Sequence, residues 1–245
     1  MLLNLKQIGD FKRDGFLILR NFIENKIIDQ WRKQFWKQVD GCYSDKSSWA
    51  RASSANNPKL TPELGSLPKI ESIMEQVSGY NFKGGGCGIL TRWPNKDNNS
   101  WVMPVSGHLD GYPGEGCQAV LMIGVTTYLY DVQPRGGSFV FWPGSHIDAH
   151  QYFLRHPERI EGTFRDTVEW KENGWSIFHG PNSQPAQEFI AEAGDIIIWH
   201  GWLMHTGSSN NQSTPRIGLF ARWTHHDDAG VRKNIPKHLW DYWTI

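Results

Sequence analysis

A histidine and an aspartate two residues apart are the first feature of this sequence that could do chemistry. His108 and Asp110 lie in Ser-Gly-His-Leu-Asp-Gly, residues 106–111. In an extended segment, residues two apart point to the same side, so this imidazole and this carboxylate would face one point. Such a pair can contribute two ligands to a metal site. A His-x-Asp triplet also occurs by chance, and a surface hydrogen bond is the alternative interpretation.

A second group of polar residues follows an apolar run near the C-terminus. Residues 196–199 read Ile-Ile-Ile-Trp, and His200 and His205 come next. Eleven residues beyond His205, Arg216 opens the run Arg-Ile-Gly-Leu-Phe-Ala-Arg, in which alternation places Arg216 and Arg222 on one face of a strand. A guanidinium that faces the interior is costly without an anionic partner. A dicarboxylate ligand would suit it, because the planar fork of arginine binds a carboxylate at two points.

Two helices followed by short strands are expected to position these side chains. Apolar residues recur at three- and four-residue steps over 24–39, which predicts a helix with one buried face. A second helix is predicted from Pro68 to Gly79, and residues 40–66 read as a loop. The run 16–19 reads as a strand or a buried entry segment. Expected strands are 88–93, 119–130, 137–142, 187–192, 195–199 and 217–223.

The length of 245 residues favours a single domain. Its plan would be N-terminal helices over about 1–80 and a β-rich core over about 81–245, because several short strands separated by turn signals indicate a sandwich or barrel. Residues 146–186 read as an insertion with a helix at 149–155 and much loop. The glycines at 84–86 lack the Lys and Ser/Thr of a phosphate-binding loop and read as a flexible turn.

Composition excludes several classes of protein. Lys plus Arg and Asp plus Glu are both 25, so a net charge of zero argues against nucleic-acid binding and against a basic membrane anchor. Three widely spaced cysteines imply neither a disulfide framework nor a cysteine-rich zinc site. No apolar stretch approaches 18 residues, and the N-terminal run is broken early, so a cytoplasmic protein is expected. No sequence feature bears on the oligomeric state.

Taken in order, these segments resemble the phytanoyl-CoA dioxygenase-like family of Fe(II)/2-oxoglutarate-dependent oxygenases. The resemblance includes the segment DVQPRGGSFVFWPGSH at 131–146 and the opening Asp-Gly-Phe at 14–16. It implies that His108, Asp110 and His205 bind iron and that Arg216 binds the far carboxylate of 2-oxoglutarate. It also implies a mainly β fold with flanking helices, the double-stranded β-helix, which is a jelly-roll or cupin-like barrel.

The activity implied by the resemblance consumes 2-oxoglutarate and O2 and releases succinate and CO2 while a small organic molecule is hydroxylated. Halogenating members of the family lack the carboxylate ligand, so Asp110 implies a hydroxylase rather than a halogenase. Many members carry Ser two residues after the distal His, where this chain has Gly207. Thr126 is expected to assist Arg216 in binding 2-oxoglutarate, at a position where many members carry an aromatic residue.

Several residues have both a functional and an ordinary structural interpretation. Trp101, Tyr112 and Arg222 could contact the substrate, but aromatic packing and, for Arg222, an ion pair at the barrel mouth are the alternatives. His200 competes with His205 as the distal ligand. The family pattern favours His205, which alone puts Arg216 at the usual spacing, and His200 would then be a packed histidine.

Other classes of function remain open at this point. The 13 tryptophans are also compatible with a non-catalytic jelly-roll that binds carbohydrate or another ligand on aromatic faces. A cupin-like metalloenzyme that does not use 2-oxoglutarate is a third hypothesis, although the usual cupin His-x-His pair is absent.

Overall fold

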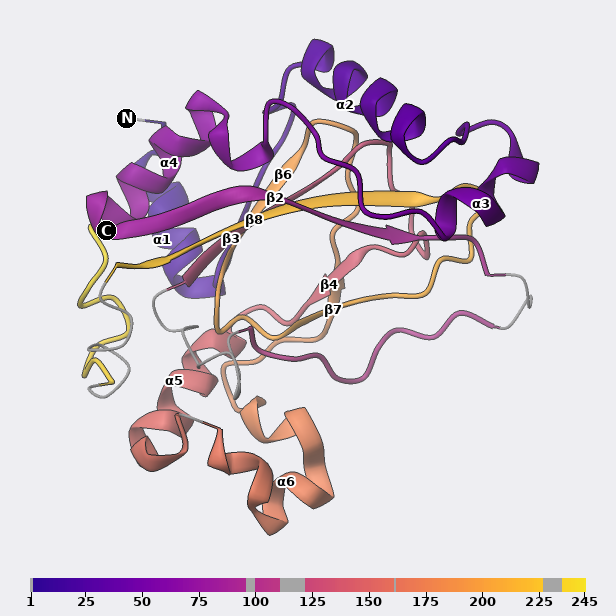
Figure 1. Ribbon diagram of the computed structural model, residues 1–245. Coiled ribbons are helices and arrows are strands. Elements are labelled where there is room, and N and C mark those ends of the chain that lie inside the picture. The colour runs from indigo at the N-terminus through magenta and orange to yellow at the C-terminus, as the bar shows by residue number, and fades with distance from the viewer. Residues whose placement is uncertain (1, 96–99, 111–121, 161, 227–234) are drawn as a thin grey trace.

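Two antiparallel sheets and six α-helices make up the described part of the chain. The computed structural model describes residues 2–95, 100–110, 122–160, 162–226 and 235–245 (Figure 1). The main sheet has the strand order β1-β6-β3-β8-β2, and the smaller sheet has the order β5-β4-β7. The strands are β1 Phe16–Leu19, β2 Phe82–Arg92, β3 Met122–Tyr128, β4 Phe139–Phe141, β5 Gln187–Glu188, β6 Ile196–His200, β7 His205–Gly207 and β8 Arg216–His225. The helices are α1 Leu5–Asp14, α2 Asn25–Gln38, α3 Trp49–Ser53, α4 Pro68–Ser78, α5 Ser145–Arg155 and α6 Val168–Asn173.

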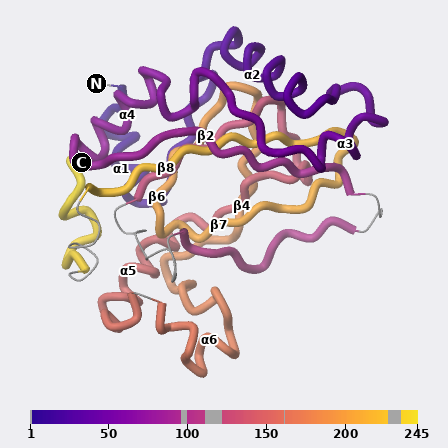
Figure 2. The backbone as a smooth tube through the Cα atoms, in the orientation of Figure 1, coloured from indigo at the N-terminus to yellow at the C-terminus, as the bar shows by residue number. Residues whose placement is uncertain are grey.

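The elements form layers around the main sheet. In Figures 1 and 2, α2 and α4 lie on one side of the main sheet, and β4 and β7 lie on the other. The chain from α5 to α6 forms a separate helical lobe at the bottom of the view. Three-residue and longer 3-10 segments connect the helices at 46–48, 64–66, 79–81, 157–159, 163–166 and 174–178.

The two predicted N-terminal helices form where periodicity and end signals placed them. Helix α2 buries Ile28, Trp31 and Phe35 on one face, and all three belong to the main apolar core. Helix α4 has Pro68 in its first turn, where the missing N–H costs nothing, and ends at Gly79. Full burial of a side chain such as Trp31, which is 0% exposed, contributes on the order of 2 kcal/mol or more.

The N-terminal region also contributes a strand to the main sheet. Strand β1 pairs with β6 in the register Phe16↔Trp199 to Leu19↔Ile196, so the sheet begins well before residue 80. Asp195, just before β6, anchors the chain beyond β1: its Oδ1 accepts a hydrogen bond from the backbone N–H of Asn21 at 2.7 Å. Of the two interpretations of the run 16–19, a strand or a buried entry segment, the strand is confirmed.

Helix α1 is an element that the apolar pattern did not predict. It begins at a capping box, in which the Asn4 side chain accepts from the Gln7 N–H while the Gln7 side chain accepts from the Asn4 N–H. It ends at Gly15, whose φ of 79° places it in the left-handed region and whose N–H reaches the Phe11 carbonyl. Leu5, Ile8 and Phe11 recur at three-residue steps, but only Phe11 is buried.

Two other expectations are corrected. The segment 40–66 is not all loop, because it contains α3 and two short 3-10 turns. The glycines at 84–86 lie inside β2, at a bulge where the pairing with β8 shifts between Gly85 and Gly88. A β-carbon on Gly65 would lie 2.5 Å from the Gly85 α-carbon, so this part of β2 packs directly against another backbone.

No α-helix within the described ranges is long and apolar enough to cross a bilayer.

Candidate functional site

The structure brings together the two histidines and the aspartate that the sequence singled out. One potential ligand atom from each of His108, Asp110 and His205 lies within 4.8 Å of the other two. The Oδ1 atom of Asp110 is 3.7 Å from Nε2 of each histidine. Asp110 and His205 are buried, and the side chain of His108 is 33% exposed. The three groups therefore face one point at the edge of the interior.

The backbone fixes the separation of the two histidines. The N–H of His108 donates to the carbonyl of His205 at 2.9 Å, and the N–H of His205 donates to the carbonyl of His108 at 3.0 Å. This reciprocal pair is the bond pattern of adjacent antiparallel residues, and the ring centroids lie 4.5 Å apart. His205 begins β7, while His108 stands outside the named strands.

The protonation states of the histidines suit a metal site. Nδ1 of His205 donates to the carbonyl of Leu203 at 2.8 Å, which leaves the lone pair on Nε2 facing Asp110. Burial, followed by the charge of neighbouring His205, lowers the pKa of His108 to about 4. Burial also lowers the pKa of His205. Both imidazoles are thus neutral at pH 7, the form that binds a metal.

Arg222 is placed against the carboxylate of the triad. Its Nε lies 2.7 Å from Oδ2 of Asp110, which is the oxygen other than the one near the histidines. The guanidinium carbon also lies 4.7 Å from the ring centroid of Phe220, on the same strand. The ion-pair interpretation of Arg222 therefore describes a real contact, and its partner is Asp110.

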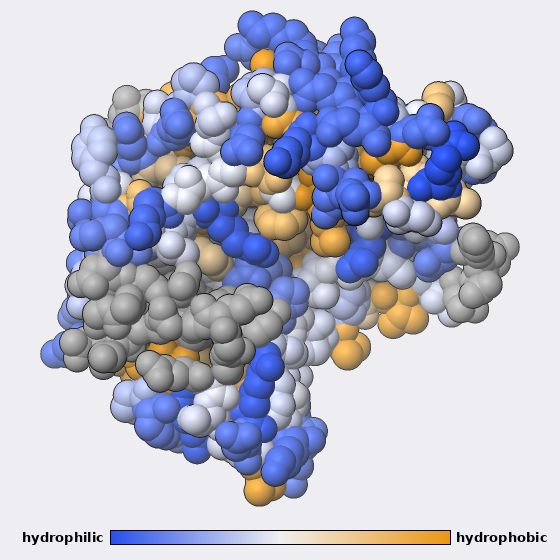
Figure 3. Space-filling view, viewed as in Figure 1, coloured by the Kyte–Doolittle hydropathy of each residue, from blue (hydrophilic) through white to orange (hydrophobic). Residues whose placement is uncertain are grey.

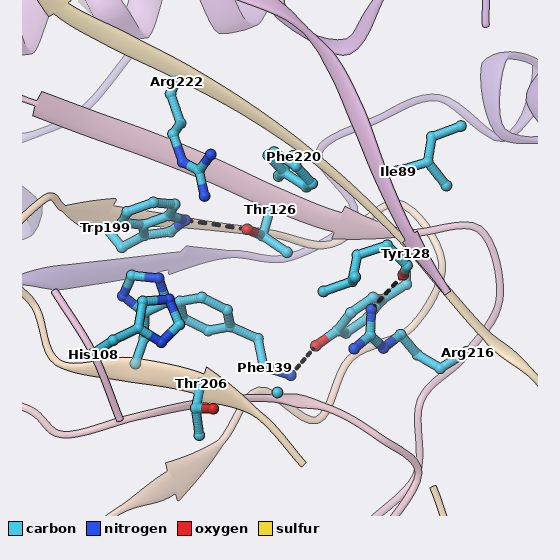
Figure 4. Close-up of a pocket in the computed structure, with 14 residues that line it drawn as sticks. Ile89, His108, Thr126, Tyr128, Phe139, Trp199, Thr206, Arg216, Phe220 and Arg222 are labelled. Carbon is cyan, nitrogen blue, oxygen red and sulfur yellow. Dashed lines mark hydrogen bonds between the residues drawn. The ribbon is translucent and has the colours of Figure 1, made fainter. Parts of the chain in front are cut away.

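A pocket lined by His108 and His205 of the triad extends to the buried arginine. Figure 4 shows His108 and Arg216 at opposite ends, with Thr126 between them. Phe139 stacks on His205 with ring centroids 5.1 Å apart, and Trp199 lies 4.7 Å from the same imidazole. The lining residues come from β2, β3, β8 and β6 of the main sheet and from β4 and β7 of the smaller one.

Arg216 is a cation held deep in the interior. Its side chain lines the pocket, and the residue is only 5% exposed. Nε donates to the carbonyl of Gly137, Nη1 donates to the carbonyl of Leu90 at 2.6 Å, and the guanidinium lies 5.8 Å from the Tyr128 ring centroid. Burial lowers the pKa of Arg216 to about 10, so the group stays charged at pH 7. The described residues offer it no carboxylate, which an anionic ligand would supply.

The remaining predicted site residues divide into three groups. Thr126 lines the pocket, where its Oγ1 accepts a hydrogen bond from Nε1 of Trp199 at 3.1 Å. Trp101 is not among the pocket residues, and its ring lies 5.9 Å from the guanidinium of Arg135. Tyr112 lies outside the described residues.

The competing histidine does not join the triad. His200 is fully buried, and its Nδ1 accepts a hydrogen bond from the N–H of Trp202 at 3.0 Å. Its ring stacks on Trp243 with centroids 5.1 Å apart. His200 is therefore a packed histidine, the role expected for it if His205 is the ligand.

The aromatic walls of the pocket, Tyr128, Phe139 and Trp199, were not identified from the sequence. Phe139 and Trp199 each belong to an apolar run, in which an inward aromatic residue carries no mark that separates pocket from core. Tyr128 differs from them because a buried tyrosine needs a hydrogen-bond partner for its hydroxyl group. The Tyr128 hydroxyl accepts a hydrogen bond from the Phe139 N–H at 2.8 Å.

Comparisons with known proteins agree with this geometry. The family profile described as Phytanoyl-CoA dioxygenase (PhyH) matches residues 104–218, a range that contains the triad and Arg216. Human peroxisomal phytanoyl-CoA dioxygenase is 20% identical over 238 residues, and the match covers 86% of this chain but 65% of the human protein. Ectoine dioxygenase from Nocardia farcinica is 22% identical over 247 residues, covering 88% of this chain and 76% of that protein.

A solved structure shares the fold. The epimerase SnoN, in complex with Fe3+, alpha ketoglutarate and nogalamycin RO, superposes with a TM-score of 0.60 at 17% identity. The superposition covers 90% of this chain and 82% of SnoN. The matched profile, the two relatives and the ordered ligand set lead to one assignment. The comparisons support the phytanoyl-CoA dioxygenase-like family of Fe(II)/2-oxoglutarate-dependent oxygenases, to which this chain is similar.

Proposed function

We propose that this protein is an Fe(II)/2-oxoglutarate-dependent dioxygenase that hydroxylates a small organic molecule and releases succinate and CO2. One observation carries the proposal: a single pocket has His108 and His205 of the triad at one end and, at the other, a buried Arg216 to which the described residues offer no carboxylate. Two imidazoles and one carboxylate on one face of a metal leave positions open for a chelating ligand and O2.

The residues present fit an iron ion. His108, Asp110 and His205 supply two neutral nitrogen ligands and one oxygen ligand, the donor set typical of non-haem Fe(II) oxygenases. No cysteine among the described residues belongs to the cluster. When bound, such an iron couples the oxidative decarboxylation of 2-oxoglutarate by O2 to the oxidation of a substrate C–H bond.

The chain itself contributes binding, orientation and exclusion of water. Arg216 would neutralise the far carboxylate of 2-oxoglutarate and so direct the 2-oxo acid end towards the triad. Phe139, Trp199 and Phe220 provide apolar walls, which strengthen electrostatic interactions inside the pocket by keeping water out. Arg222 would hold Asp110 in position from the side opposite the histidines.

The choice of hydroxylation rests on Asp110. A carboxylate at this ligand position occupies the place that a halide would need, which favours hydroxylation over halogenation. SnoN is an epimerase, so the shared fold is compatible with other oxidative outcomes, and product analysis distinguishes them. The relatives' substrates do not carry over to this chain, and a small organic molecule is the proposed substrate class.

The two sheets are proposed to be the two halves of a double-stranded β-helix within one domain spanning residues 1–245. Support comes from the antiparallel strand order, from pocket residues contributed by both sheets, and from the similarity to SnoN. The contribution of β1 to the main sheet argues against a separate N-terminal unit.

The alternative of a carbohydrate-binding module loses its main support. Seven of the 13 tryptophans are buried and therefore serve the core; they are Trp31, Trp36, Trp142, Trp199, Trp202, Trp223 and Trp243. Figure 3 shows a mostly hydrophilic face on which apolar residues form separate small patches. The tryptophan content follows from packing and does not require a sugar-binding surface.

The test is an anaerobic titration of the metal-free protein with Fe(II) and then 2-oxoglutarate, followed by visible absorption. A charge-transfer band of the chelated 2-oxo acid is expected. The band should disappear in His205→Ala and require at least tenfold more 2-oxoglutarate in Arg216→Ala, while the exposed-site control His238→Ala behaves as the parent protein. A folded, iron-loaded protein that shows no band contradicts the proposal.

A further inference from the structure

A second arginine lies beside Arg216, next to the pocket although not among the residues that line it. Arg92 of β2 is paired directly with Arg216 of β8, so the two side chains leave the sheet on the same face. Leu90, two residues before Arg92, lies on that face and lines the pocket. The sequence drew no attention to Arg92, because its only mark is this register with a residue far along the chain.

The two guanidiniums converge on one small volume above Gly207. A β-carbon built on Gly207 would lie 3.1 Å from Nη2 and 3.3 Å from Nε of Arg92, and 3.6 Å from Nη2 of Arg216. Gly207 lies two residues beyond His205 in β7, so a side chain there would point to the same face as the metal-facing imidazole. The space left by this glycine is therefore inside the site.

At least one donor of this arginine pair has no acceptor among the described residues. Arg216 uses Nε and Nη1 on the carbonyls of Gly137 and Leu90, and its Nη2 lies beside the space above Gly207. Nε of Arg92 is buried without a hydrogen-bond acceptor among the described residues. An unpaired buried donor on a charged group is costly, and two adjacent guanidiniums repel each other. An anion placed between them removes both penalties.

We propose that Arg92 is a second 2-oxoglutarate-binding residue, whose guanidinium shares the far carboxylate of the co-substrate with Arg216. Arg216 commits its Nε–H and one N–H of Nη1 to backbone carbonyls, so only part of its donor set is left for an anion. Arg92 supplies the missing donors from the opposite side of the space that a side chain at residue 207 would fill. The assignment of the anion as 2-oxoglutarate rests on the proposed function.

The proposal makes Gly207 and Arg92 interdependent. A serine at residue 207 would place its β-carbon within 3.3 Å of two Arg92 nitrogens, so the guanidinium would have to move away. Gly207→Ser should therefore weaken 2-oxoglutarate binding when Arg92 is present. In an Arg92→Ala background the same serine occupies vacant space and offers a hydroxyl, so there it should strengthen binding.

The experiment measures two dissociation constants for each variant. The first is for 2-oxoglutarate, from the charge-transfer band in anaerobic Fe(II)-loaded protein. The second is for glutarate, by calorimetry on metal-free protein. Arg92→Gln should raise both about 10- to 100-fold, the range for loss of a charge-assisted hydrogen bond, while the Fe(II) dissociation constant stays within twofold. Arg92→Lys, which keeps the charge without the fork, should be intermediate. Arg155→Gln removes an exposed guanidinium on α5 and should change neither constant.

The outcomes separate this proposal from the general one. Absence of the band in the parent protein refutes the proposed function, and the glutarate measurement then decides the role of Arg92 by itself. The proposal is overturned if Arg92→Gln and Arg92→Lys both bind glutarate within twofold of the parent protein, or if the parent does not bind it. It is also overturned if Gly207→Ser has the same effect on binding with and without Arg92.

Discussion

Arg222 and Asp110 form an ion pair that uses only one face of the carboxylate. Nε of Arg222 lies 2.7 Å from Oδ2, whereas Oδ1 is 3.7 Å from Nε2 of both His108 and His205. One oxygen is thus directed to the metal position and the other is tied to a cation. The pair orients the ligand in the way that outer partners orient ligands in other metal sites.

Removal of this partner should weaken metal binding. Arg222→Gln is expected to raise the Fe(II) dissociation constant about 10- to 100-fold, the usual cost of losing a group that orients a ligand. Competition against a metal-binding dye measures it, with Arg155→Gln as the matched control. Metal affinity within twofold of the parent would show that Asp110 is held without Arg222.

Thr126 should affect the co-substrate more than the fold. Its Oγ1 accepts from Trp199, so its own hydroxyl hydrogen is free to donate into the pocket. Thr126→Val keeps the shape and removes this donor, and the 2-oxoglutarate dissociation constant should rise roughly fivefold, the equivalent of one neutral hydrogen bond. Thr126→Ser, which retains the hydroxyl, should bind as the parent does. Binding by Thr126→Val at the strength of the parent protein would show that the hydroxyl does not contact the co-substrate.

Gly124 makes room for the wall of the pocket. A β-carbon there would lie 2.1 Å from Cζ2 of Trp199, which is 1% exposed and cannot move outward. Gly124→Ala should therefore lower the free energy of unfolding by about 1–3 kcal/mol, as measured by urea denaturation. The matched control is Gly9→Ala in α1, where the added methyl group meets nothing within 4 Å and should be neutral or stabilising. Comparable losses in both variants would contradict this explanation.

His146 should make the protein less stable in acid. Its Nε2 donates to the carbonyl of Lys12 at 3.1 Å, and burial lowers its pKa to about 4 from the usual 6.5. The unfolded chain therefore takes up a proton that the folded protein refuses. The resulting loss in the free energy of unfolding is absent above pH 6.5. It grows as the pH falls towards 4, where it reaches about 3 kcal/mol.

The measurement compares the free energy of unfolding of the parent protein and His146→Gln from pH 7.5 to 4.5. The difference between the two curves isolates His146, because other buried histidines, including those of the triad, titrate in both proteins. The parent curve should fall more steeply than the variant curve below about pH 6.5. Parallel curves would mean that His146 keeps an ordinary pKa in the folded protein.

Local signals account for the part of the structure that the sequence predicted. Helix α4 has a proline at its start, a glycine at its end and an apolar stripe between them, so neighbours in the chain define it. Two members of the triad are also defined by neighbours in the chain, since His108 and Asp110 are two residues apart. His205 and Arg216 were placed by their spacing within a family pattern, and the structure brings both to one pocket.

The features that were missed depend on contacts between distant parts of the chain. Three consecutive glycines in the sequence suggested a flexible turn. In the structure they lie in β2, where the strand packs directly against the backbone at Gly65. Strand β7 has only three residues and is defined by its pairing with β4. Arg92 acquires its position from β8, more than a hundred residues away. No local pattern encodes such relationships.

The reciprocal backbone bonds between His108 and His205 have a consequence for how such a protein can diversify. The two residues are about a hundred positions apart in the chain, yet each holds the other by its peptide group, so the distance between the ligands does not depend on the length of chain that joins them. The lobe from α5 to α6 lies within that interval. Insertions and substitutions in this lobe can therefore change which substrate binds without changing the distance between the two metal ligands.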